Sequence, residues 1–175
     1  MDKKVVKNYL YNLSYQLLLI ILPIITTPYV SRVLGAKGVG TYSYTNSITQ
    51  YFILLGCIGL NLYGQREIAY YQNDIKKRNR TFFELLFLRF ITLTISIIIF
   101  YFTMVSHSKY SYIFIIQVLD IIASIFDISW FFQGIEDFQK TVLRNFVVRI
   151  ICVSLIFIFV KSPNDLQLYV LCYSG

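Results

Sequence analysis

The chain has 175 residues, of which 57% are hydrophobic and only 14% are charged, and its formal net charge is +7. Its mean hydropathy of +0.61 is far above that of an average soluble domain, and its charged residues are too few to coat a globule. The composition therefore excludes an ordinary water-soluble domain and indicates a membrane protein.

Six apolar stretches, separated by short polar and basic connectors, fill almost the whole chain. Each of the first five has about the 20 residues that a helix needs to cross a hydrocarbon core ~30 Å thick. The stretches lack the alternation of barrel strands, so the sequence predicts an all-α, polytopic bundle of transmembrane helices over residues 1–175. The predicted full spans are 9–31, 42–64, 82–105, 110–132 and 142–160. A sixth, 166–175, breaks off after ten residues, and we therefore expect the chain to be a fragment.

The basic residues lie mainly in connectors and at span ends, which argues against a nucleic-acid surface and agrees with the positive-inside rule. Connectors on the side of the N-terminus carry ten: Lys3, Lys4, Lys7, Arg66, Lys76, Lys77, Arg78, Arg80, Lys140 and Arg144. Connectors on the other side carry four: Arg32, Lys37, Lys109 and Lys161. This asymmetry predicts a cytoplasmic N-terminus in the cell membrane. The longest connector, 65–81, is predicted to be a basic cytoplasmic loop that contacts anionic lipid headgroups.

Two prolines interrupt the first predicted span, Pro23 near its middle and Pro28 near its end. Each removes a backbone hydrogen bond and favours a kink, which a membrane helix tolerates where neighbours or water satisfy the freed carbonyl group. The kink is either a static bend or a hinge for alternating access.

Polar side chains recur at helical spacing in the spans, so that each helix has a polar face. A charged side chain that faces lipid costs about 2.5–3.5 kcal/mol on insertion scales, so these faces are predicted to turn towards the interior. The residues that we single out on them are Gln50, Arg89, Asp120, Asp127, Asn145 and Arg149. Two interpretations remain open: structural ion pairs between the arginines and the aspartates, or a water-filled cavity that passes a large polar or charged solute.

Residues suited to catalysis are sparse. The cysteines Cys57, Cys152 and Cys172 are scattered through apolar segments, and the single histidine, His107, has no acidic partner at useful spacing. The sequence therefore offers no metal-ligand cluster and predicts neither an enzyme nor a bound cofactor.

Several segments resemble the opening of the Wzx-type oligosaccharide flippases, which belong to the multidrug/oligosaccharidyl-lipid/polysaccharide exporter superfamily. The first of these segments is Tyr-Asn-Leu-Ser-Tyr at 11–15. It is followed by Pro23, by the run 28–35 and by the run 63–69. Phe-Asp-Ile-Ser-Trp-Phe-Phe-Gln-Gly-Ile-Glu at 126–136 is similar to the fourth and fifth helices of that family. The resemblance implies two pseudo-symmetric lobes around a central cavity, of which residues 1–175 form most of the N-terminal lobe. The missing C-terminal lobe would be its first partner.

The resemblance also implies a function: translocation of oligosaccharide repeat units, linked to undecaprenyl pyrophosphate, for O-antigen, capsule or related polymers. The expected partners are this lipid-linked oligosaccharide, membrane lipids, and a polymerase and other polysaccharide-assembly proteins. The expected substrate contacts are Arg89, Arg149, Asn145 and Gln50, and Asp120 and Asp127 are the expected sites of coupling to a proton or sodium gradient. The alternatives are a drug or cation antiporter of the same superfamily, and an inactive truncated remnant.

Overall fold

The computed structural model describes the backbone of residues 3–173, and all of their side chains except those of 3–12, 15, 138 and 140. Within residues 3–173 every regular element is a helix, which confirms the predicted all-α class. Four stretches are long and apolar enough to cross a membrane: Gln16–Cys57, Ile75–Val105, Ser111–Gly134 and Thr141–Phe159. The architecture is that of a polytopic helical bundle.

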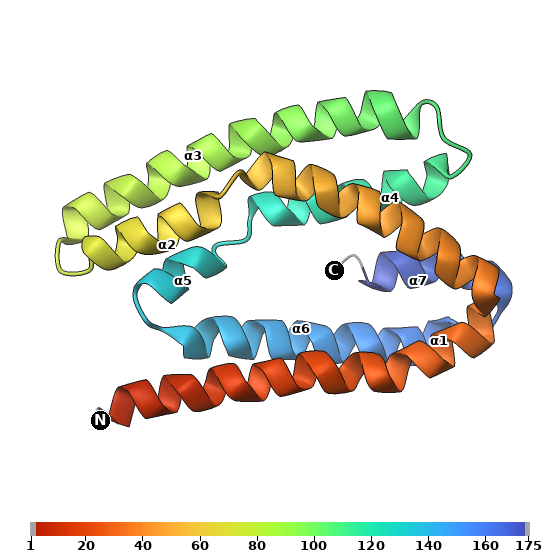
Figure 1. Ribbon diagram of the computed structural model, residues 1–175, viewed down its shortest axis with the longest axis horizontal. Helices are drawn as coiled ribbons and strands as arrows, with labels where there is room; N and C mark the ends of the chain where they lie inside the picture. Colours follow the sequence, from red (N-terminus) through yellow and green to blue (C-terminus); the bar gives the residue numbers. More distant parts are fainter. Residues whose placement is uncertain (1–2, 174–175) are drawn as a thin grey trace.

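The first helix, α1 (Lys3–Cys57), reverses its direction at Gly35, the one residue inside it with a non-helical backbone. Figure 1 shows the chain running away from its N-terminus and then returning beside α3 and α4. Gly35 has φ 69° and ψ 173°, a combination that is essentially restricted to glycine. The two arms, 3–34 and 36–57, therefore correspond to the first two predicted spans. The connector predicted between them, 32–41, is wrong only in its length: the turn lies at one of its glycines, and the flanking residues stay helical.

The predicted loop 65–81 is also wrong. Helix α2 (Leu60–Tyr70) and helix α3 (Ile75–Phe100) occupy most of it and leave only residues 71–74 between them. The Asp74 carboxylate accepts a hydrogen bond from the backbone N–H of Lys77 at 3.1 Å, and this N-cap starts α3 inside the polar segment. A short π-helical turn, η1 (Tyr101–Val105), continues α3 at its far end.

The fourth predicted span, 110–132, consists of two helices instead of one. Helix α4 (Ser111–Ile125) and helix α5 (Ser129–Gly134) are separated by residues 126–128. Helix α6 (Phe138–Phe159) is the fifth span, and the turn η2 (Pro163–Asp165) leads into α7 (Leu166–Tyr173). Helix α7 covers most of the truncated sixth span, whose residues 174 and 175 lie outside the described residues.

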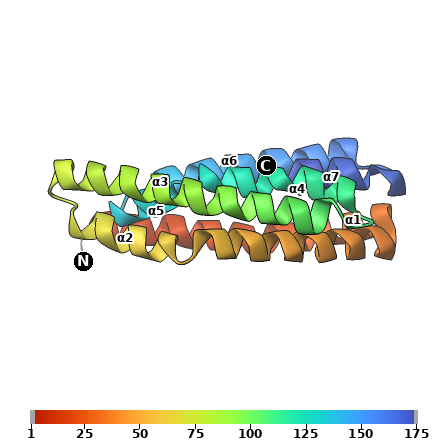
Figure 2. The same cartoon turned by 90° about the horizontal axis from the view of Figure 1, so that it is seen from above.

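The helix connections gather at two opposite ends of the bundle, as Figures 1 and 2 show. The N-terminal end of α1, the α2–α3 turn and the α5–α6 turn lie at one end. The reversal at Gly35, the α3–α4 connection and η2 lie at the other end. The connectors that carry many basic residues therefore lie at one end of the bundle, and those that carry few lie at the other. The assignment of the first end to the cytoplasm stays a prediction.

Two buried clusters hold the second arm of α1, α2, α3, α4 and α5 together. Leu93, Phe100 and Phe114 belong to the cluster between α1, α3 and α4. The second cluster joins α2, α3 and α5 around Trp130. Helices α2 and α5 can approach closely because residue 64 is glycine: a Cβ atom there would lie 2.6 Å from the Trp130 ring.

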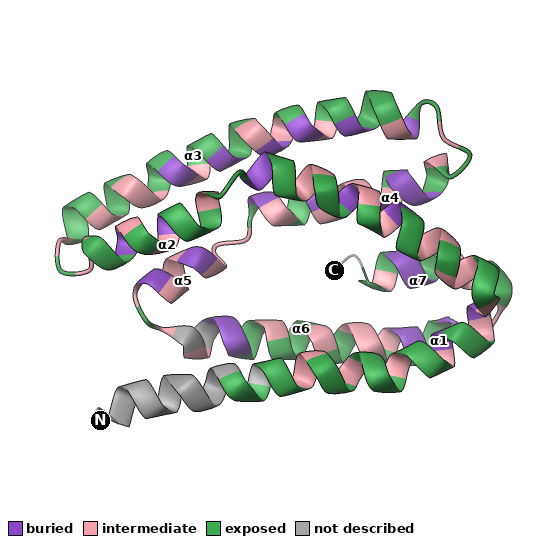
Figure 3. Ribbon diagram, in the orientation of Figure 1, coloured by how far each residue is buried: buried purple, intermediate pink, exposed green. Residues whose placement is uncertain are grey.

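A third cluster packs the reversal of α1 against the end of α6 and against α7, through Val30, Leu34, Ile156 and Val160. Among residues 13–29 of the first arm, the described side chains are mostly exposed, as Figure 3 shows. Ile20 and Ile24, for example, are 60% and 66% exposed. Apolar side chains with this exposure require lipid or further protein around them.

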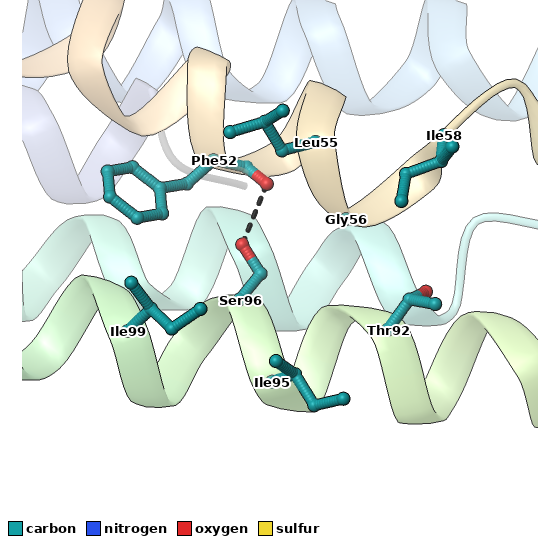
Figure 4. Close-up of a pocket in the computed structure, with 8 residues that line it drawn as sticks. All are labelled: Phe52, Leu55, Gly56, Ile58, Thr92, Ile95, Ser96 and Ile99. Carbon is teal, nitrogen blue, oxygen red and sulfur yellow. Dashed lines mark hydrogen bonds between the residues drawn. The ribbon is translucent and has the colours of Figure 1, made fainter.

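The outer surface between α1 and α3 carries an apolar groove of about 290 Å³, shown in Figure 4. Its polar groups are satisfied within the fold: the Ser96 hydroxyl donates to the carbonyl oxygen of Phe52 at 2.7 Å, and the Thr92 hydroxyl donates to that of Arg89 at 3.1 Å. Side chains such as Leu55, Ile95 and Ile99 therefore present a hydrocarbon surface.

Candidate functional site

Three adjoining hollows lie on one part of the bundle: two are lined by α6 where it meets α4, α5 and α7, and the third lies between α7 and the two arms of α1. We call them the elbow hollow, about 440 Å³, the middle hollow, about 190 Å³, and the tyrosine hollow, about 220 Å³. Asn145 and Val148 line both the elbow and the middle hollow, and Tyr173 lines both the middle and the tyrosine hollow. The shared residues join the three hollows into one surface that carries both polar and apolar side chains.

The elbow hollow is built around Asp127, in the break between α4 and α5. The Asp127 carboxylate accepts hydrogen bonds from the backbone N–H and the hydroxyl of Ser129, so it starts α5 in the way that aspartates start turns. Arg144 reaches it from α6, with 3.2 Å between Nη2 and Oδ1. The two side chains are 40% and 46% exposed, and such pairs stabilise a fold by only about 0–1 kcal/mol. The pair therefore contributes little to the stability of the fold, and its main effect is to place a carboxylate and a guanidinium at the elbow hollow.

The middle hollow contains Arg149, half-buried on α6. Its Nη2 donates to the Tyr173 hydroxyl at 3.1 Å, and its guanidinium lies 5.1 Å from the centre of the same ring. Asn145 lies one helical turn before Arg149, and its side-chain oxygen accepts two hydrogen bonds from Arg144, at 3.1 and 3.2 Å. One face of α6 thus presents two guanidinium groups and an amide, as the predicted spacing of Asn145 and Arg149 requires.

The tyrosine hollow lies beside the reversal of α1, where Tyr42 meets Tyr169 and Tyr173 of α7. The turn η2 fixes the start of α7. Its Asp165 carboxylate accepts hydrogen bonds from the backbone N–H groups of Lys161 and Ser162, at 3.0 and 2.8 Å, and these bonds lower the pKa of Asp165. This cap orients the two tyrosines of α7 towards α1.

Arg89 lies outside the three hollows and is only 3% exposed. Its Nε donates to the backbone oxygen of Ser124 at 2.8 Å, and its Nη1 donates to the Asn61 side chain at 2.7 Å. Ser124 is in the last turn of α4, where carbonyl groups lack partners within the helix, so Arg89 caps α4 and joins it to α2 and α3. Arg89 therefore does not line the three hollows, and in the described residues its guanidinium donates to an amide oxygen and a carbonyl oxygen. A role in substrate binding stays a prediction.

The other predicted residues lie in different settings. Gln50 is exposed on the second arm of α1 and does not line the three hollows. Asp120 is half-buried on α4, within electrostatic range of Tyr42. Pro23 lines the tyrosine hollow, and Pro28 is exposed nearby. Helix α1 continues through both prolines, and its break lies at Gly35. A hinge at the prolines stays a prediction.

The polar face predicted for the fourth span divides at the break. Gln117 is fully buried in the helical core, with 3.1 Å between its side-chain oxygen and the Thr49 hydroxyl, whereas Asp127 opens onto the elbow hollow. A single straight helix would have kept both residues on one side, and the break between α4 and α5 rotates them apart.

Sequence reasoning missed Arg144 and the three tyrosines. Arg144 was counted as a connector charge, although it lies within α6, directly before the predicted site residue Asn145. Tyr42, Tyr169 and Tyr173 belong to apolar runs, and a hydrophobic pattern does not separate a site tyrosine from a core one. Among the described residues, no three His, Cys, Asp or Glu side chains gather as metal ligands.

The family model described as "Polysaccharide biosynthesis protein" matches residues 5–175 of this chain. Two curated relatives carry the name "Putative O-antigen transporter". One, from Escherichia coli strain K12, is 25% identical over 153 residues, which is 85% of this chain and 36% of the relative. The other, from Shigella dysenteriae, is 28% identical over 146 residues, which is 82% of this chain and 37% of the relative. The chain thus spans little more than a third of these relatives. No solved structure matches it.

Proposed function

Since the chain belongs to the polysaccharide biosynthesis protein family, we propose that it is the N-terminal lobe of a transporter that moves lipid-linked oligosaccharides across the cell membrane. The observation that carries this proposal is the joined surface of the three hollows, which presents hydroxyl, amide and charged groups on a bundle of long apolar helices. A large polar solute needs such a surface in order to pass between apolar helices.

The anionic part of the substrate is the pyrophosphate that joins undecaprenol to the sugars, and the arginines of α6 are its contacts. A guanidinium stays charged in a poorly solvated site and binds phosphate oxygens through parallel hydrogen bonds. Arg149 and Arg144 flank Asn145, so a phosphate beside α6 meets two cations and an amide donor.

Coupling to a proton or sodium gradient acts through the aspartates, Asp127 first and Asp120 second. The Asp127 carboxylate forms an ion pair with Arg144, with 3.2 Å between Oδ1 and Nη2. A proton or a sodium ion on that carboxylate weakens its attraction to Arg144 and releases the guanidinium for the phosphate. Substrate binding and ion binding at this pair would then support each other.

The same proposal places the chain in the cytoplasmic membrane with its N-terminus in the cytoplasm, where the connectors rich in basic residues would lie. A C-terminal lobe would cover the open face of the hollows, and a polymerase and other assembly proteins would receive the sugars. The relatives' names concern O-antigen, and capsule or related polymers are further destinations of the same chemistry.

A drug or cation antiporter is less compatible with this site. Two arginines on one face of α6 repel a cationic drug, and only Asp127 opposes them among the residues that line the elbow and middle hollows. An inactive remnant remains the alternative that an activity measurement decides.

The deciding experiment is complementation. The complete transporter that contains this segment is expressed in a bacterium that lacks its own O-antigen transporter, and surface polysaccharide is measured on intact cells. We expect surface polymer with the unaltered protein and none with Arg149→Ala, although immunoblots show equal amounts in the membrane. Full export by Arg149→Ala, or no export by the unaltered protein with any tested repeat unit, would contradict the proposal.

A further inference from the structure

The lining of the tyrosine hollow is unusually rich in hydroxyl groups. Seven of its ten lining residues carry one: three tyrosines, three Ser or Thr residues on the first arm of α1, and Ser43 on the second arm. None of the ten is charged. This composition differs from the elbow hollow, which contains a carboxylate and a guanidinium, and from the apolar groove in Figure 4.

The three tyrosine rings form a corner. The Tyr42 ring lies 4.9 Å from that of Tyr169 and 5.6 Å from that of Tyr173, centre to centre, and both pairs are close to perpendicular, at 76° and 71°. The rings of Tyr169 and Tyr173 are 5.9 Å apart. Because Tyr42 comes from α1 and the other two come from α7, the corner exists only while these helices are packed together.

This chemistry excludes several ligands. A hydrocarbon tail would offer no hydrogen bond to the hydroxyl groups of the lining, whereas a polar ligand can use the donor and acceptor sites that their existing bonds leave open. A phosphate or a metal ion would find no opposite charge in the lining. A pyranose ring fits, because its C–H faces pack on the negative faces of aromatic rings and its hydroxyl rim exchanges hydrogen bonds with hydroxyl groups.

We propose that the tyrosine hollow is a subsite for one pyranose unit of the oligosaccharide, stacked in the corner of Tyr42, Tyr169 and Tyr173. The inference rests on the proposed function and adds to it the place where the sugar binds. The shared wall at Tyr173 puts the next part of the substrate in the middle hollow, where Arg149 meets an anionic group. The substrate thus lies along α6, with its neutral sugar towards the reversal of α1.

The hydroxyl groups also select an orientation. The Thr26 hydroxyl donates to the carbonyl oxygen of Leu22 at 2.9 Å, so its proton is engaged and its oxygen remains an acceptor. A sugar hydroxyl beside Thr26 must therefore donate.

The test measures protection of a thiol. In the full chain, reconstituted in lipid nanodiscs, the three native cysteines are replaced by alanine, and Ser43→Cys places one thiol at the hollow. Its rate of reaction with N-ethylmaleimide is measured with maltotetraose, with sorbitol as an acyclic polyol, and with inorganic pyrophosphate. Ser154→Cys in the same background is the reference, since Ser154 lies on α6 outside the hollow.

We expect maltotetraose, and neither sorbitol nor pyrophosphate, to slow the reaction at position 43 and to leave the reference unchanged. Tyr42→Leu should raise the concentration needed for half-protection about fivefold, the size of one lost stacking contact. Tyr51→Leu, at an exposed tyrosine on the same arm, should not change it. If Tyr42→Leu unfolds, Tyr42→Phe gives the same comparison for the hydroxyl alone.

Equal protection by pyrophosphate would indicate an anion site, and equal protection by sorbitol would indicate no stacking. Either result, or no protection by maltotetraose in a folded protein, overturns the subsite. The proposed function fails separately, in the complementation experiment: sugar protection without export would leave the subsite standing and remove the transport role.

Discussion

Arg89 and Arg149 are the two arginines predicted to contact the substrate, and the structure gives them opposite surroundings. Arg89 is enclosed by three helices and has a side-chain amide and a backbone carbonyl as fixed partners. Arg149 is half-buried beside an open hollow, where a tyrosine hydroxyl and ring are its contacts. An intramembrane arginine is therefore not evidence of a cavity by itself, because a helix end can satisfy its charge.

The first prediction tests the enclosed region. Arg89→Ala leaves the Asn61 side chain and the Ser124 carbonyl without their partner, and each buried group left without a hydrogen bond costs about 1–3 kcal/mol. We expect a large fall in the melting temperature in detergent, followed by Trp130 fluorescence and circular dichroism. Arg89→Lys should rescue little of it, because lysine cannot reach two acceptors with a planar fork.

The matched control is Arg149→Ala, which should melt close to the unaltered chain. Equal losses of stability in the two variants would show that both arginines are structural, and the contrast between the regions would disappear.

The second prediction concerns the reversal that joins the two regions. Gly35→Ala forces a side chain into a backbone conformation that costs about 1–3 kcal/mol, although no atom lies within 4 Å of the new Cβ. Gly40→Ala is the control: it also has open space around it, but its backbone is helical, so alanine should be neutral or slightly stabilising. Thermal melting of the two variants distinguishes backbone strain from crowding. Similar melting curves would mean that the reversal does not depend on glycine.

These two regions also show how far sequence reasoning reaches. Hydropathy alone predicts the helical class and the positions of the long helices, since membrane helices need a fixed length of apolar residues. Gly35 lies between the first two predicted spans, as a turn must, but its single-residue reversal depends on backbone angles that composition does not determine. The break between α4 and α5 was missed because residues 126–128 are not unusual in a helix, and the packing of Arg89 against α4 decides where that helix ends.

At the candidate site, Asn145, Arg149 and Asp127 could be predicted, because polar residues at helical spacing in an apolar run are visible in the sequence. The pairing of Asp127 with Arg144 could not be predicted, since the two residues are 17 positions apart and Asp127 lies in a break that the sequence did not indicate. The tyrosines were equally hidden, because their rings add to the apolar pattern that defines the spans.

The third prediction sharpens the comparison at the open site. Asp127→Asn and Arg144→Gln should each change the free energy of unfolding by only about 0–1 kcal/mol, because both side chains are partly exposed. Export should nevertheless fall strongly in both single variants of the complete transporter. Under the proposed role, the double variant also fails to export, because the phosphate contact is still absent. Restored export in the double variant would show that the pair is merely structural.

The smallest effect is expected at Tyr173, whose hydroxyl and ring both contact Arg149. Tyr173→Phe removes one partly exposed hydrogen bond of 3.1 Å and keeps the ring 5.1 Å from the guanidinium, so it should cost about 0.5–1 kcal/mol. Tyr173→Leu removes the ring as well, and should lower export further while the melting temperature changes little. Among the described residues, no aromatic ring is recorded against the Arg89 guanidinium, so of the two arginines we expect this graded response at Arg149. If Tyr173→Phe already abolished export, the hydroxyl and not the ring would be the group that orients Arg149.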